Sequence, residues 1–168
     1  SKEMLKIMNR RNKVLSDLEL FEFLSQNGYA LGTDFIVGHP GETKEIWQEA
    51  MKNLHNFPLT HIHAFTYSKR DGTPSASMKD IVKGDIAKDR YIELVEMIKQ
   101  KNYEFRQNIK KNKVKLEVLV EQEKNGKYLG FDQFFNQVEI SSNEDLVSDW
   151  LNLEDYKVEF NKNEARYK

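Results

Sequence analysis

The chain has 168 residues, of which 39% are hydrophobic, and this is enough for one domain, or one domain and a small module, with a buried core. Its 26 basic and 27 acidic residues nearly cancel, which excludes the overall charge signature of a nucleic-acid binder but not a local basic face. The absence of cysteine excludes disulfides, cysteine-ligated zinc and any iron–sulfur cluster carried by this chain. Because it lacks an initiator methionine and an apolar run long enough to span a bilayer, we expect a cytoplasmic fragment with no membrane partner.

An α/β pattern occupies the first part of the chain. Apolar residues recur at helical spacing in Met4–Met8 and Leu18–Leu24, and a β-branched and aromatic run then predicts a strand over Leu31–Val37. A turn rich in glycine and proline follows this strand, and Thr43 is placed to cap the next helix. A second strand is expected over Ile62–Tyr67. The carboxyl ends of such strands bind ligands, so the glycine turn is a candidate ligand site.

The first strand carries one polar residue, Asp34, inside its apolar run. Side chains alternate along a strand, so Asp34 and Ile36 share one face while Phe35 and Val37 share the other. A carboxylate is unfavourable against an apolar helix layer. We therefore expect Asp34 to point away from the helices, either toward a ligand or toward neighbouring backbone amides that satisfy it.

The second strand carries two histidines on one side, His61 and His63, a spacing compatible with metal ligation. No third ligand is evident, so imidazoles lining the sheet in line with Phe65 and Tyr67 are favoured over a metal site. Ser68 follows at the end of the strand without a base partner, which favours a hydrogen-bonding role over nucleophilic catalysis.

In the rest of the chain the spacing of apolar residues changes from that of a helix to the alternation of strands. An apolar stripe between Tyr91 and Ile109 predicts a long helix, and alternation over Val114–Glu121 then predicts a half-buried strand. Asn125-Gly126 is a strong signal for a two-residue hairpin, and alternation over Tyr156–Phe160 predicts a last strand. We expect an α/β region over residues 1–110 and a small antiparallel β domain over residues 111–168.

The predicted β domain interleaves basic and aromatic side chains, as single-stranded RNA binders do for phosphate contact and base stacking. These residues are Lys124, Lys127, Tyr128, Phe131, Phe134 and Phe135. An ordinary β core explains the aromatic residues equally well. From Ile109 onward acidic residues outnumber basic ones by about two, so an RNA-binding face must be a segregated basic patch. The lysines available for it are Lys110, Lys111, Lys113 and Lys115.

Three motifs occur in an order that resembles the radical SAM methylthiotransferase family. They are Met4–Arg10, Thr33–Thr43 and Tyr67–Pro74. The segment Leu116–Phe131 is similar to the TRAM domain that follows the radical SAM core in those enzymes. Within the family, His61–Ser68 together with Arg70 and Gly72-Thr73 looks most like the branch that methylthiolates threonylcarbamoyladenosine beside the tRNA anticodon.

The resemblance implies the later βα units of a partial TIM-type radical SAM barrel, followed by a small antiparallel β-barrel of the TRAM type. The implied parent enzyme uses S-adenosylmethionine (SAM) and two [4Fe-4S] clusters to add a methylthio group to an N6-modified adenosine. It implies the tRNA anticodon stem-loop as partner. Without the cluster cysteines this chain ligates neither cluster and should be inactive alone. The alternatives are an RNA-binding module without catalysis and a related enzyme that modifies a ribosomal protein.

The resemblance also implies binding residues. Those for the cofactor are Arg10, Asp34, Ile36, Gly38, His63, Tyr67 and Ser68. Those for RNA are Arg70, Lys124, Lys127, Tyr128 and Phe131. Glu42 lies one residue beyond the family's glutamate position and receives no ligand role. An isolated half-barrel exposes strand edges, which predicts a dimer of the fragment.

Overall fold

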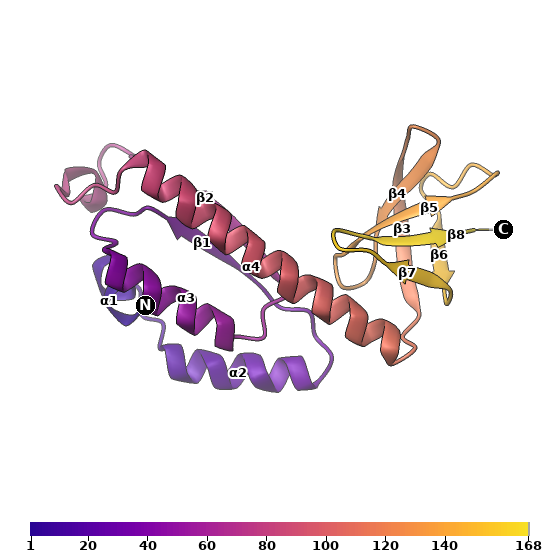
Figure 1. Cartoon of the computed structure of the whole chain (residues 1–168), viewed down its shortest axis with the longest axis horizontal. Coiled ribbons are helices and arrows are strands. Elements are labelled where there is room, and N and C mark those ends of the chain that lie inside the picture. Colours follow the sequence, from indigo (N-terminus) through magenta and orange to yellow (C-terminus); the bar gives the residue numbers. More distant parts are fainter. Residues whose placement is uncertain (168) are drawn as a thin grey trace. The chain divides into compact units, whose positions relative to one another are not determined.

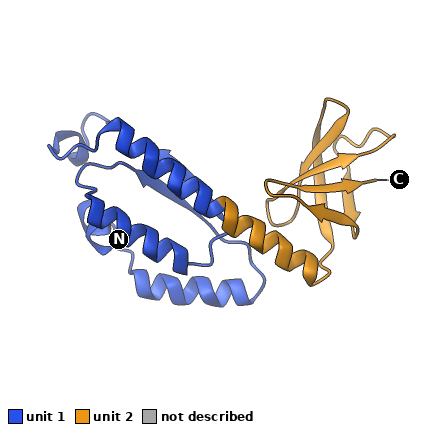
Figure 2. Cartoon of the chain, viewed as in Figure 1, with its two compact units in different colours: residues 1–98 blue, residues 99–168 orange. Residues whose placement is uncertain are grey.

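A computed structural model describes residues 1–167, which divide into two units at Ile98 and Lys99. The division falls inside α4 (Gly84–Lys111), so the last turns of that helix belong to the second unit (Figure 2). The other elements of unit 1 are α1 (Lys2–Ile7), α2 (Val14–Gln26), β1 (Gly32–Val37), α3 (Lys44–Asn56), β2 (His61–Thr66) and the 3₁₀ helix η1 (Pro74–Ser77). Those of unit 2 are β3 (Leu116–Lys124), β4 (Lys127–Phe131), β5 (Gln137–Ser141), β6 (Trp150–Leu153), β7 (Tyr156–Val158) and β8 (Asn163–Arg166).

Unit 1 is built on a parallel pair of strands. β1 and β2 pair from Gly32 opposite His61 to Val37 opposite Thr66, with α3 as the crossover between them (Figure 1). The predicted helix cap is confirmed, since the Thr43 hydroxyl accepts a hydrogen bond from the Ile46 N–H. The mixed α/β prediction is therefore confirmed for this unit, while a partial TIM-type barrel is a finer interpretation that two strands do not test.

The two faces of this sheet differ. The core of unit 1 joins one face to α3 and α4, and its members are Val37, Trp47, Met51, Leu54, Leu59, Leu94, Met97 and Ile98. On the opposite face Asp34 pairs with His63 and Ile36 pairs with Phe65, and the Phe65 side chain is 52% exposed. The expectation that Asp34 points away from the helices is confirmed, because its neighbours Phe35 and Val37 pack on the helix side.

Unit 2 is a curled six-stranded sheet in the order β6-β3-β4-β5-β8-β7 (Figure 1). Asn125 and Gly126 form the predicted hairpin turn with φ of 55° and 75°, the left-handed values that a type I′ turn requires. The prediction of a purely antiparallel sheet is wrong at one place, since β5 and β8 are parallel. β8 enters between β5 and β7, so a strand from the end of the chain completes a sheet begun much earlier.

A buried arginine organises unit 2 alongside its apolar core. Arg106, on α4, is 1% exposed. Its guanidinium donates to the backbone oxygens of Glu159 (2.7 Å), Phe160 (2.6 Å) and Lys162 (2.8 Å). It also donates to the side-chain oxygens of Asn102 (2.8 Å) and Asn163 (3.1 Å). The guanidinium therefore ties the segment between β7 and β8 to the helix.

Candidate functional site

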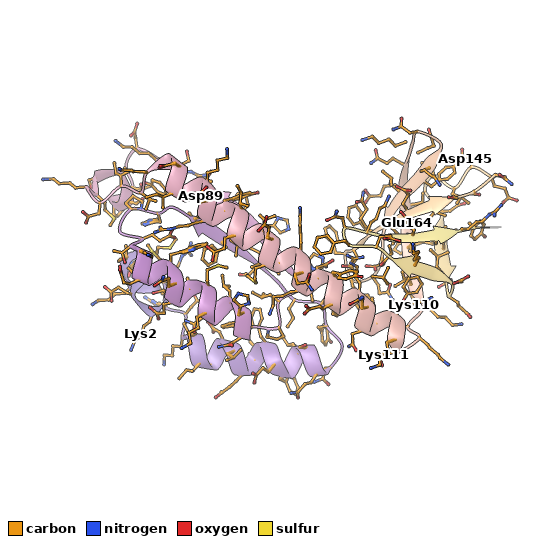
Figure 3. All side chains as sticks on the ribbon, viewed as in Figure 1. Lys2, Asp89, Lys110, Lys111, Asp145 and Glu164 are labelled. Atoms are coloured by element: carbon orange, nitrogen blue, oxygen red, sulfur yellow. The ribbon has the colours of Figure 1, made fainter. Side chains whose placement is uncertain are left out.

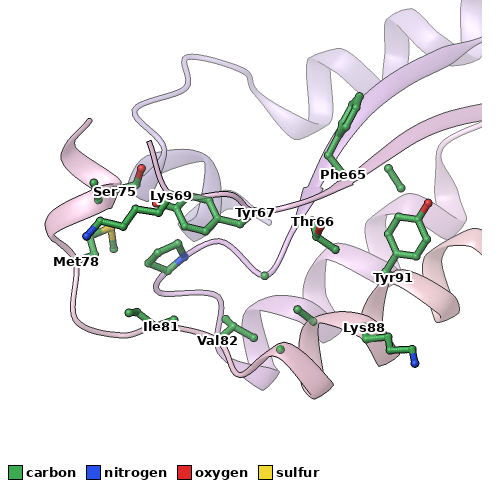
Figure 4. Close-up of a pocket in the computed structure, with 16 residues that line it drawn as sticks. Phe65, Thr66, Tyr67, Lys69, Ser75, Met78, Ile81, Val82, Lys88 and Tyr91 are labelled. Atoms are coloured by element: carbon green, nitrogen blue, oxygen red, sulfur yellow. The ribbon is translucent and has the colours of Figure 1, made fainter. Parts of the chain in front are cut away.

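A pocket of about 810 Å³ lies at the carboxyl ends of β1 and β2, where ligands bind in parallel sheets. Gly38 follows β1, Tyr67 and Lys69 follow β2, and Lys88 and Tyr91 come from α4. Figure 4 shows Tyr67 and Lys69 toward one end of the pocket and Lys88 and Tyr91 toward the other. Two lysines and two phenols around an apolar lining suit a ligand with both an anionic and an aromatic or aliphatic part.

Tyr67 contributes an unused hydrogen-bonding group to this pocket. Its ring packs edge-on against His39, with centroids 5.1 Å apart, and its N–H donates to the Val37 carbonyl at 2.8 Å. Its hydroxyl is buried and has no partner among residues 1–167. Buried hydroxyls are nearly always hydrogen-bonded, so an unpaired one beside a pocket marks a place where a partner is missing from the described residues.

The glycine turn after β1 is fastened by a buried ion pair. Glu42 Oε1 accepts hydrogen bonds from the Gly38 N–H at 3.1 Å and from Arg90 Nη1 at 2.7 Å. Arg90 also donates to the Glu42 backbone oxygen at 2.9 Å, and its guanidinium lies 5.6 Å from the Trp47 ring centroid. Both charged side chains are almost fully covered. Glu42 thus fixes the turn to α4, a role that the sequence pattern did not reveal.

Gly38 is expected to tolerate no side chain. Its φ is +77°, and an added Cβ would lie 2.8 Å from the Cβ of Ala87 on α4. We expect Gly38→Ala to lower the free energy of unfolding by about 2–4 kcal/mol, from positive-φ strain and overpacking together. Gly28→Ala is the matched control, because Gly28 has φ +84° with no atom near the added Cβ, and about 1–2 kcal/mol is expected there. Thermal unfolding of the two variants gives the comparison, and equal losses would show that the contact with Ala87 adds no cost.

The cofactor residues implied by the resemblance are divided among three places. Gly38 and Tyr67 line the pocket, and the exposed Ser68 follows directly after Tyr67. The remaining residues of β1 and β2, Asp34, Ile36 and His63, lie on the sheet face opposite the helices. Arg10 lines a separate hollow beside α1. These roles stay predictions.

The sheet-face residues are chemically available. Within residues 1–167 the Asp34 carboxylate has no hydrogen bond or ion pair, so the alternative of an aspartate satisfied by backbone amides is not seen. His61 is tied to the Thr60 hydroxyl at 2.8 Å. No cluster of three or more potential ligands that could hold a metal ion is present in the described part of the chain.

The predicted RNA-binding residues are scattered. Arg70 is exposed in the loop after β2, where its carbonyl accepts from the Thr73 hydroxyl at 2.7 Å. Lys124 and Lys127 face each other beside the hairpin turn of unit 2. Tyr128 packs against the core of unit 2, whereas Phe131 stacks on Phe135 outside that core. A core role for the aromatic residues therefore holds for only some of them.

The predicted basic patch is partly neutralised. Figure 3 labels Lys110 and Lys111 at the end of α4. Lys110 lies over the Tyr156 ring and 3.9 Å from Asp155, and Lys115 pairs with Glu154 at 2.5 Å. These exposed pairs reduce the net positive charge available to a phosphate backbone.

The chain is similar to several methylthiotransferases over part of their length. It is 44% identical over 162 residues to a protein of Helicobacter pylori strain J99 with the provisional name methylthiotransferase, covering 96% of this chain and 39% of the relative. It is 36% identical over 133 residues to the ribosomal protein uS12 methylthiotransferase of Caldanaerobacter subterraneus, covering 77% of this chain and 30% of the relative. It is 27% identical over 143 residues to the threonylcarbamoyladenosine tRNA methylthiotransferase of Bacillus subtilis, covering 83% of this chain and 32% of the relative.

These similarities do not point to one substrate. The chain is similar to methylthiotransferases, and it spans about two fifths or less of the length of the curated relatives it matches. The names of the relatives refer to a ribosomal protein in one case and to a tRNA in the other. No family model matches the chain. No helix within residues 1–167 is long and apolar enough to cross a membrane.

Proposed function

We propose that this chain is the part of a radical SAM methylthiotransferase that supplies one wall of the SAM site and a TRAM-like β domain. The similarity to a methylthiotransferase carries the proposal, since it extends over 96% of the chain and so includes both units. The exposed side of α2 supports it, because Leu15, Leu20 and Phe23 are 77%, 54% and 62% exposed and would gain from cover by further protein. The cluster ligands, which no residue of this chain supplies, are assigned to the rest of the enzyme.

Residues on the exposed face of β1 and at the carboxyl end of β2 support binding of SAM. Ile36 offers an apolar surface for the adenine, and the Asp34 carboxylate, which has no partner within residues 1–167, offers an acceptor for hydroxyl or ammonium groups. The unpaired Tyr67 hydroxyl adds a hydrogen-bonding group. SAM, when bound, supplies the radical chemistry and the methyl group, and the residues of this chain orient it and exclude water.

The proposed substrate is the N6-modified adenosine beside the tRNA anticodon, in the threonylcarbamoyl branch. The loop after β2 supports this choice, because Arg70, Gly72 and Thr73 form one turn in which Gly72 has φ +82° and Thr73 is hydrogen-bonded to Arg70. This turn leaves Arg70 exposed for a phosphate contact. The second candidate is ribosomal protein uS12, favoured by the 36% identity to an enzyme named for it.

The full-length enzyme carrying this chain tests the proposal. Asp34→Ala is expected to lower methylthiolation and SAM affinity by about tenfold or more, since a hydrogen bond to a charged group contributes about 1.5–3 kcal/mol. Asp89→Ala is the matched control, because Asp89 is an exposed carboxylate on α4 (Figure 3). SAM affinity is measured by equilibrium dialysis, and the product by mass analysis of tRNA nucleosides and of uS12 from cells lacking the gene. If the deletion left the tRNA nucleosides unchanged but removed the methylthio group from uS12, the tRNA branch would be refuted. If the deletion changed neither the nucleosides nor uS12, the proposed function would be refuted.

A further inference from the structure

A row of apolar side chains crosses the outer face of the unit 2 sheet. Leu119 of β3 is in register with Phe131 of β4 on one side and with Trp150 of β6 on the other. Paired residues of neighbouring strands point to the same face. The neighbours Val118 and Val120 are fully buried on the inner face, so this row points outward. Trp150 is 69% exposed.

The turn that follows β4 adds a fourth residue, Phe135, to this row. Phe135 stacks on Phe131 with ring centroids 4.9 Å apart and an interplanar angle of 20°, and it is 66% exposed. Its φ of +64° is unfavourable for a residue with a side chain. The buried Asp132 holds this conformation, since its Oδ1 accepts from the Phe134 N–H at 2.9 Å and the Asn136 N–H at 2.8 Å. The fold thus keeps Phe135 in an unfavourable backbone conformation although its ring faces solvent.

We call the three aromatic residues Phe131, Phe135 and Trp150, together with Leu119 between two of them, the aromatic row. None of them belongs to the apolar core of unit 2 or packs against it. Single exposed apolar residues are ordinary, but a contiguous set on one sheet face marks an interaction surface. Stacked aromatic rings can hold either nucleic-acid bases or planar guanidinium groups.

Charge decides between these two occupants. From Leu116 to Leu153 the chain has two basic residues against eight acidic ones. The two basic residues, Lys124 and Lys127, lie at the hairpin turn, at the far end of the β3–β4 ladder from the row. Glu117 shares the outer face two residues before Leu119, and Asp149 precedes Trp150. Such surroundings repel a phosphate backbone and attract cations.

We propose that the aromatic row is a docking surface for a basic, arginine-containing protein segment. Arginine side chains would stack on the exposed rings while Glu117 and Asp149 neutralise their charge. This surface is distinct from the strand-end pocket of unit 1 and does not depend on the function proposed for that pocket.

The test titrates the whole chain with a short arginine- and glycine-rich peptide while recording the two tryptophan indole N–H signals by NMR. Trp150 should shift, and Trp47, which is buried and donates to Glu93, should not. Phe135→Ala should raise the dissociation constant of the peptide by about tenfold, because it removes one of the two stacked rings, Phe131 and Phe135. Phe160→Ala, an exposed aromatic outside the row, should leave it unchanged within about twofold.

Three outcomes would overturn the proposal. Equal peptide affinity for the wild type and Phe135→Ala would reduce the binding to general charge attraction. A shift of Trp150 by single-stranded RNA but not by the peptide would assign the row to nucleic acid. Loss of concentration-dependent association in Trp150→Ala, measured by sedimentation, would assign it to a second copy of this chain. The folding of each variant is checked from the signals of Val118 and Val120.

Discussion

Arg106→Met is expected to lower the free energy of unfolding of unit 2 by about 3–5 kcal/mol, the cost of leaving several buried polar groups without their charged partner. The methionine fills similar volume, so the loss reports hydrogen bonding rather than a cavity. The backbone oxygens of Glu159, Phe160 and Lys162 would lose their donor together. Hydrogen exchange of the β5 and β8 amides in urea measures the change within this unit.

Two controls bound the Arg106 effect. Arg166→Met removes an exposed arginine from β8 and should change stability by no more than about 0.5 kcal/mol. Arg106→Lys keeps the charge but cannot reach carbonyls in several directions at once, so an intermediate loss is expected. A loss below about 1 kcal/mol for Arg106→Met would mean that water replaces the guanidinium and that the segment after β7 is held by other contacts.

Arg90→Met is expected to lower the free energy of unfolding of unit 1 by about 3–5 kcal/mol, because it strands the buried Glu42 carboxylate. The Gly38 turn should loosen at the same time, since Glu42 holds the Gly38 N–H. Thermal unfolding and exchange of the Gly38 amide report the two effects.

The double variant Glu42→Met with Arg90→Met separates the charge from the packing. Replacing both partners of a buried pair by apolar residues is often close to neutral, so this variant should recover most of the stability lost in Arg90→Met. The Gly38 amide, which loses its Glu42 acceptor in this variant, should be less protected than in the wild type. If the double variant were as unstable as the single one, packing of Arg90 on Trp47 would be the larger contribution.

Local signals were predicted from the sequence where they are strong. The Thr43 cap, α3 and the Asn125-Gly126 hairpin depend on residues close along the chain, and the structure confirms them. β5, β6 and β8 were not predicted. β8 reads Asn-Glu-Ala-Arg and has no apolar alternation, and the Oδ1 of its buried Asn163 accepts a hydrogen bond from Arg106.

The faces of the hairpin show why the rest could not be read. Counting back from the Asn125-Gly126 turn with regular pairing sets Val120 opposite Phe131, which would put Phe131 inside. A bulge between Val120 and Gln122 shifts the register, so Leu119 pairs with Phe131 and the ring points outward. In the candidate site, the Gly38 turn was foreseen, but the Glu42–Arg90 pair joins residues 48 positions apart and left no local pattern.

The position of β8 in the sheet also bears on when this unit forms during synthesis. β8 is the strand that bridges β5 and β7, so before the ribosome has released residues as far as Arg166, β5 has one bare edge and β7 has no neighbour. The hydrogen bonds of Arg106 to backbone carbonyls also form only after this stretch is synthesised, because the acceptors lie between Glu159 and Lys162. Such distant pairing is slow compared with helix formation. The sheet of unit 2 can therefore be completed only after β8 has been translated, whereas β1, α3 and β2 are all synthesised far earlier and can pair at that stage.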